Sequence, residues 1–160
     1  PLVTQLRAAE ETTASLDAEI MSWHKSNEAS KRLATIPGVG VLTASAIAAT
    51  VPDPSFFCSG REFSAWLGLT PRQNSSGGKD RLGRISKQGN RYIRRLLVIG
   101  ATSVLRHARA KSAPGADWVN GLLERRPPRL VTVAMANKTA RIAWALLTKG
   151  ETYRAPIAVV

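Results

Sequence analysis

Two serines followed by two glycines are the residues of this chain best suited to chemistry. Ser75 and Ser76 precede Gly77 and Gly78 in a polar segment. Glycine lets the backbone come close to a phosphate and leaves a neighbouring hydroxyl uncrowded at the tip of a loop. A serine hydroxyl is a weak nucleophile, so it needs a base, a metal ion or cationic surroundings. On local sequence alone, a surface turn is the simpler interpretation.

The serines lie inside a strongly basic block. Between Arg72 and Lys111 there are eleven Lys or Arg against one acid, Asp80, so this quarter of the chain carries +10 of the net +12. Such a field favours a polyanion, and its cations would stabilise the charge of a phosphate undergoing transfer. The alternative is a solvated basic face. We predict nucleic-acid contacts from Arg72, Lys79, Arg81, Arg84, Lys87, Arg91, Arg94 and Arg95.

Three of these arginines open a predicted helix over residues 91–110, with Asn90 as its N-cap. Cations at a helix start oppose the helix dipole unless an anion lies there, which favours a bound phosphate. His107, on the same helix, is a candidate base for the serine, and His24 is the other histidine of the chain.

Composition limits the other possibilities. With 160 residues, 44% of them apolar, the chain can form one core. The single cysteine, Cys58, excludes an intramolecular disulfide, and the sequence offers no cluster of metal ligands. No apolar run reaches the roughly 20 residues of a membrane span. We expect a cytoplasmic, nucleoid-associated protein without a membrane partner. Because the chain starts at Pro1 within a predicted helix, we expect a fragment.

The helical periodicity predicts an all-α fold, since no alternating strand pattern is present. Residues 1–26 form a coiled-coil-like helix, for which an amphipathic helix packing on its own domain is the alternative. Residues 27–155 form the helical domain. The apolar seam of the first helix consists of Leu2, Leu6, Ala9, Thr13, Leu16, Ile20 and Trp23.

The segment Ile36-Pro37-Gly38-Val39-Gly40-Val41 predicts a helix-hairpin-helix motif within residues 27–51. Gly38 and Gly40 would allow the tight turn, and the amides at the start of the second helix would bind a phosphate without reading bases. The alternative is an ordinary helix–helix corner.

Further helices are predicted around this motif. Ser59-Gly60-Arg61-Glu62 has the spacing of a capping box, and the predicted core includes Phe56, Phe57 and Phe63. A last helix covers residues 130–148 and ends at Gly150, with Trp144 inward and the cations Lys138 and Arg141 outward.

With these motifs in place, the chain from Leu33 onward resembles the C-terminal half of the insertion-sequence transposases of the "one-ten" family, including its "eleven-eleven" branch, the bridge-RNA-guided recombinases. The resemblance rests on Ile36-Pro37-Gly38-Val39-Gly40, Phe63 to Gly68 with Pro71, Ser76-Gly77-Gly78-Lys79, Gly83-Arg84-Ile85-Ser86-Lys87-Gln88-Gly89-Asn90, Arg94-Arg95 and Asn137-Lys138-Thr139-Ala140-Arg141.

The resemblance implies a DNA transposase in which this domain supplies a nucleophilic serine. By position the serine is Ser76, with Ser75 as the alternate. A RuvC-like domain N-terminal to the chain would hold Mg²⁺, so the fragment needs no cofactor of its own and is inactive alone. The implied partners are DNA, a guide RNA and further copies in a homodimer or higher oligomer. Two other functions stay open: a non-catalytic helix-hairpin-helix module that grips phosphates, and a coiled-coil assembly domain.

Overall fold

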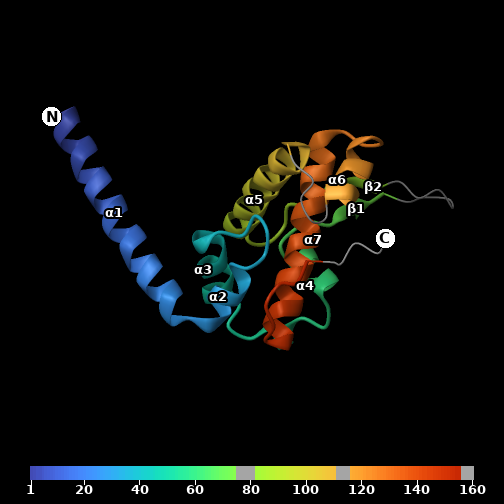
Figure 1. Ribbon diagram of the computed structural model, residues 1–160, viewed down its shortest axis with the longest axis horizontal. Coiled ribbons are helices and arrows are strands. Elements are labelled where there is room, and N and C mark those ends of the chain that lie inside the picture. The colour runs from blue at the N-terminus through green and yellow to red at the C-terminus, as the bar shows by residue number, and fades with distance from the viewer. Residues whose placement is uncertain (75–81, 111–115, 156–160) are drawn as a thin grey trace.

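The computed structural model describes residues 1–74, 82–110 and 116–155, and these are mainly helical, as predicted. Figure 1 shows the helices gathered around α7, with α1 extending away from them. The elements in chain order are α1 (Leu2–Ser26), α2 (Glu28–Leu33), α3 (Val41–Thr50), the 3₁₀ helix η1 (Pro54–Phe56), α4 (Gly60–Trp66), β1 (Pro71–Gln73), β2 (Leu82–Ile85), α5 (Arg91–Ala110), α6 (Ala116–Leu123) and α7 (Pro128–Lys149).

Side-chain caps fix the starts of α2, α4 and α5, and those of α4 and α5 confirm the sequence predictions. The Glu62 amide donates to Ser59 Oγ at 3.2 Å, while Glu62 Oε2 accepts from the Cys58 amide at 2.7 Å. The carboxylate therefore reaches one residue beyond the usual partner of a capping box. At α5, the Ile93 amide donates to Asn90 Oδ1 at 3.0 Å, which satisfies an amide that the helix leaves unpaired.

The hydrophobic core lies where α7 packs against α4 and α5, with α2 and α3 closing one end. Trp144 of α7 points inward as predicted, and its Nε1 donates to the Pro54 carbonyl at 3.2 Å. Helix α7 ends at Gly150, which has φ 69° in the left-handed region. The fully buried apolar side chains include Leu33, Ile47, Phe63, Leu67, Ile93 and Val131.

The turn between α2 and α3 packs directly onto α5 through two glycines. Gly38 has φ 81°, and a Cβ there would lie 2.8 Å from the Gly100 carbonyl oxygen. A Cβ at Gly100 would in turn overlap the Gly38 carbonyl oxygen. The two backbones thus touch without a side chain between them, and this contact fixes the turn on α5.

A small two-stranded sheet corrects the expectation of a fold without strands. Strands β1 and β2 pair antiparallel, with Pro71 opposite Ile85 and Gln73 opposite Leu82. Neither strand has the apolar alternation of a half-buried sheet, and β1 is exposed throughout. The pair forms because the chain on both sides of it is anchored to helices, a tertiary constraint that periodicity does not report.

Phe56 was predicted to lie in the core, and this was wrong. It is 77% exposed, because the 3₁₀ turn directs it outward. Phe57 and Phe63 do pack together, with ring centroids 5.2 Å apart in an edge-to-face arrangement. Trp66 completes this aromatic cluster.

Among the helices and strands that the structure describes, α1 contacts α2 and α3 alone, and it buries none of its residues. His24 Nδ1 lies 2.7 Å from Ser30 Oγ, which is itself 3.3 Å from Ser45 Oγ in α3. This chain of hydrogen bonds joins the end of α1 to the domain. Along the predicted apolar seam, Leu6 is 60% and Leu16 52% exposed.

The contact between Gly38 and Gly100 predicts that Gly100→Ala destabilises the protein. The new methyl group would press on a carbonyl oxygen, at a cost of about 1–3 kcal/mol in the free energy of unfolding measured by urea denaturation. Gly121→Ala in α6 is the matched control, since a Cβ there meets nothing within 4 Å; it should be neutral or stabilise by up to about 1 kcal/mol. Equal stabilities for the two variants would contradict the close approach.

Candidate nucleic-acid interface

Further backbone hydrogen bonds extend the strand pair β1–β2 on the side away from residues 74–81. We call residues 68–73 and 82–89 together the stem. Beyond the strands, the Ser86 amide donates to the Thr70 carbonyl at 2.9 Å. The Lys87 amide donates to the Gly68 carbonyl at 3.1 Å. These bonds hold the chain segments on either side of residues 74–81 at a fixed separation.

Two glycines let the stem rest on the end of α4. Gly68 has φ 71° and ends α4 in a Schellman motif, in which the Gly68 amide bonds the Ala65 carbonyl and the Leu69 amide bonds the Ser64 carbonyl. Gly89 has φ 72°, and a Cβ there would overlap the Trp66 carbonyl oxygen. Any larger residue at either position would push the stem away from the helix.

Arg94 ties this junction to α5. Its Nη1 donates to the Leu67 and Gln88 carbonyls, both at 2.8 Å, and the side chain is half-buried. Arg94 was predicted to bind nucleic acid, and that stays a prediction. Two main-chain carbonyls already accept hydrogen bonds from its guanidinium, so it gives less support for a phosphate at the start of α5 than Arg91 and Arg95 do.

Five predicted nucleic-acid contacts are exposed cations around the stem and the start of α5. Arg91 and Arg95 are four residues apart and therefore share one face of the helix, and no acid occupies the first turn of α5. Lys87 has φ 57°, a left-handed conformation that costs free energy because it brings the Cβ close to the following carbonyl oxygen. The five are Arg72, Arg84, Lys87, Arg91 and Arg95. Ser75, Ser76, Lys79 and Arg81 lie outside the described residues.

The predicted phosphate site of the α2–α3 turn is divided between two environments. Gly38 packs against α5, whereas Gly40, the N-cap of α3, is exposed with open space around it. The start of α3 is therefore accessible from solvent, while Gly38 supports the turn from behind. The prediction that the two glycines contact a phosphate stays a prediction.

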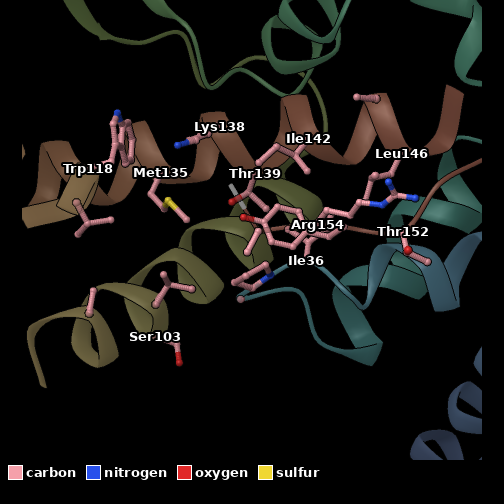
Figure 2. A pocket seen from close by; sticks show the side chains of 18 of the residues that line it. Ile36, Ser103, Trp118, Met135, Lys138, Thr139, Ile142, Leu146, Thr152 and Arg154 are labelled. Atoms are coloured by element: carbon pink, nitrogen blue, oxygen red, sulfur yellow. The ribbon is translucent and has the colours of Figure 1, made fainter. Parts of the chain in front are cut away.

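His107, the candidate base, lies far along α5 from the stem. It is 16 residues after Arg91, which at 1.5 Å per residue places it about 24 Å away along the helix axis. Its Nδ1 lies 2.8 Å from the Ser103 carbonyl oxygen, and it lines a cavity of about 730 Å³. Figure 2 shows that cavity between α5 and α7, with Lys138 and Trp118 together at one end and Arg154 further along it.

Sequence reasoning missed Tyr92 as a candidate contact. This ring is 57% exposed beside Arg91, where it offers a flat surface for a base. An aromatic residue among exposed arginines was the available signal. Lys138 and Arg141 were predicted only to point outward; Arg141 is exposed, but Lys138 is half-buried with its Nζ 4.1 Å from the centroid of the Trp118 ring.

Comparison with known proteins identifies the family of the chain. Residues 30–114 match the transposase IS116/IS110/IS902 family. The chain belongs to this transposase family. The match includes the α2–α3 turn, the stem and α5, so the interface described above is built from the segment that defines the family.

Similar proteins extend the likeness to most of the chain. A putative transposase, y4pF/y4sB, of Sinorhizobium fredii is 52% identical over 87% of this chain and 36% of its own length. A probable family 20 transposase of Pseudomonas aeruginosa is 45% identical over 96% of this chain and 45% of its own. The transposase of insertion sequence element IS1111A from Coxiella burnetii is 45% identical over 96% and 42%. The chain therefore spans less than half the length of these relatives.

The geometry of Arg94 predicts that Arg94→Gln lowers stability in this transposase chain. Loss of charge-assisted hydrogen bonds to two carbonyls should cost about 1–3 kcal/mol in the free energy of unfolding measured with urea. Arg95→Gln, one residue further on the exposed face, should stay within about 0.5 kcal/mol of wild type. Arg95→Gln should instead lower the slope of log K against log salt for DNA binding by about 1, as expected when one phosphate contact is lost. If Arg94→Gln kept wild-type stability and lost DNA affinity as Arg95→Gln does, Arg94 would be a phosphate ligand.

Proposed function

We propose that the chain is the C-terminal DNA-binding and catalytic domain of an insertion-sequence transposase, and that it contributes the nucleophilic serine of strand cleavage and exchange. Family membership is the observation that carries this proposal. The stem supports it, since the Ser-Gly-Gly segment follows β1 and precedes β2, and both strands are held on α4 and α5. The nucleophile is Ser76, with Ser75 as the alternate.

In the proposed reaction, Ser76 Oγ attacks a DNA phosphorus atom and loses its proton to a base. A serine–phosphate bond forms, the bond from phosphorus to the 3′ oxygen breaks, and the leaving oxygen takes up a proton as a free 3′ hydroxyl. Strand exchange follows when another 3′ hydroxyl attacks the phosphoserine and releases the serine. Exposed cations such as Arg84, Arg91 and Arg95 would stabilise the charge on the phosphate.

Metal chemistry in this proposal belongs to another domain. Within residues 1–74, 82–110 and 116–155, no three His, Cys, Asp or Glu side chains gather where they could hold a metal ion. We place the ligands of Mg²⁺ in a RuvC-like domain of the full-length protein. A guide RNA is the proposed second nucleic-acid partner. Within the same ranges, no helix combines the length and apolar character needed to cross a bilayer.

The test is a covalent adduct. The full-length protein, with guide RNA and Mg²⁺, is incubated with a nicked, labelled donor DNA, and the products are separated under denaturing conditions. Wild type should give a protein–DNA adduct, and Ser76→Ala should abolish it because the attacking oxygen is gone. Ser75→Ala is the matched control and should retain the adduct.

The possible outcomes distinguish serine catalysis itself from the choice of Ser76 as the nucleophile. Loss of the adduct in Ser75→Ala alone would keep the mechanism and move the nucleophile by one residue. An active wild type that forms no adduct would refute serine catalysis, and the serines would then position phosphate while the metal domain cuts with water.

A non-catalytic phosphate-binding module is the second candidate function. The accessible start of α3 at Gly40 favours it, since free amides at a helix start bind phosphates without reading bases. It predicts DNA binding with a steep salt dependence and no covalent species under any condition.

We also propose that α1 pairs with the same helix of a second copy. The helix has no buried residue, and its apolar seam is exposed except at Ile20, which is half-buried. Heptad spacing of such a seam favours helix pairing, and strand exchange needs more than one active centre. The proposed assembly is a homodimer or a higher oligomer.

Pairing through α1 predicts that Leu6→Ser with Leu16→Ser shifts the chain to a monomer in light scattering coupled to size exclusion. Each substitution removes an apolar contact from the seam, so the dissociation constant should rise at least about a hundredfold at about 1.4 kcal/mol per tenfold. Leu130→Ser is the control, because Leu130 is a 55% exposed leucine on α7, away from the seam. Unchanged mass in the double variant would refute pairing through α1.

A further inference from the structure

A second cavity of about 730 Å³ lies on the side of α7 that faces α4 and α6. Its floor is formed by α7, with Ala134, Ile142 and Ala145. The start of α4 and Trp118 of α6 form its walls. We call this cavity the α4–α7 groove. None of the residues that line it belongs to the stem or to the start of α5.

Two arginines line this groove from different helices. A Cβ at Gly60 would lie 3.1 Å from the Arg141 carbonyl oxygen and 3.3 Å from its Cβ, so the first residue of α4 packs closely on α7. Arg61, the next residue, and Arg141 both line the groove, and both side chains are exposed. Like charges that line one groove repel each other, and an anion bound there would offset that repulsion.

A third cation completes the lining. Lys138 lies one turn before Arg141 on α7, and its Nζ is 4.1 Å from the centroid of the Trp118 ring. Trp118 and Lys138 line both cavities, as Ile142 and Ala145 do, and Figure 2 shows the lysine directed toward the ring. The cation–π contact keeps the ammonium at the groove while Trp118 stays 40% exposed.

The lining contains no acid that would neutralise these cations. Arg61, Lys138 and Arg141 are its charged residues. Across the part of the chain that the structure describes, the one ion pair joins Lys31 and Glu28, in α2. The groove is thus a positively charged channel with an apolar floor.

The groove also leads toward the stem. Asn137, on its floor one turn before Arg141, donates from Nδ2 to the Leu69 carbonyl at 3.1 Å. Leu69 stands two residues before β1. A ligand lying along the groove would therefore reach the base of the stem, where the exposed cations of the candidate interface begin.

We propose that the α4–α7 groove binds the sugar–phosphate backbone of a nucleic-acid strand, with Arg61, Lys138 and Arg141 at successive phosphates. Three cations and no acid among the lining residues fit a polyanion, and these cations come from two helices, α4 and α7, as contacts to more than one phosphate require. The choice of nucleic acid as the polyanion rests on the proposed function. The groove is a second contact surface, separate from the stem.

The test compares the salt dependence of binding for matched variants of the purified chain. Labelled duplex DNA, single-stranded DNA and single-stranded RNA of about 20 nucleotides are titrated by fluorescence anisotropy between about 50 and 200 mM salt. The triple variant Arg61→Gln, Lys138→Gln, Arg141→Gln should lower the slope of log K against log salt by about 2 to 3 on the probe that fills the groove. That probe identifies which nucleic acid the groove holds.

The control removes the same charge elsewhere. Arg125, Arg126 and Arg129 are exposed where α6 leads into α7, and none of them lines either cavity. Their triple change to Gln should alter the slope by less than about 1. Because Lys138 packs on Trp118, the double variant Arg61→Gln with Arg141→Gln, both at exposed positions, is measured as well and should lower the slope by about 1.5 to 2.

Failure of the groove and failure of the proposed function give different results. Suppose that wild type binds, and that the groove triple, the groove double and the control triple all lower the slope of log K against log salt by the same small amount on every probe. The groove proposal is then refuted while the proposed function stands. If wild type binds none of the three probes at low salt, nucleic-acid binding by this chain is refuted together with the groove.

Discussion

The hydrogen bonds of one guanidinium hold together the part of this protein on which the candidate interface depends. Arg94 reaches from α5 to the last turn of α4 at Leu67 and to the stem at Gln88. The contact is possible because Gly68 and Gly89 lack side chains where the backbones meet. A single exposed cation has little effect on stability, but one that satisfies two carbonyls at a junction of three segments fixes their relative positions. The position of the stem follows from this junction.

The same device of backbone contact without side chains recurs elsewhere in the domain. Gly38 meets Gly100, which seats the α2–α3 turn on α5, and Gly60 meets Arg141, which seats α4 on α7. Small residues at helix contacts let helices approach closely, so the backbones touch at these points without side chains between them. These contacts set the spacing of the elements that carry the exposed cations.

Charge and shape divide the protein into two parts with different tasks. Helix α1 carries four acids and an exposed apolar seam, whereas the domain carries the net positive charge. The domain displays that charge on the stem with the start of α5 and on the α4–α7 groove, and the Asn137–Leu69 hydrogen bond connects the two. The acidic, seam-bearing helix and the basic domain therefore present opposite charge on different surfaces, which suits the separate roles proposed for them above.

Local rules in the sequence determined the helices and their ends. Ser59 and Asn90 cap α4 and α5 where the sequence placed them, Gly150 ends α7, and the basic block marked the nucleic-acid candidates, because caps and net charge depend on residues close together in the chain. The tertiary structure alone decided the rest. Strands β1 and β2 exist because distant helices anchor their ends, and Arg94 differs from its neighbour Arg95 because two carbonyls lie within its reach. Gly60 meets Arg141 from 81 positions away. Such contacts depend on how helices pack against one another, and no local pattern of residue types contains that information.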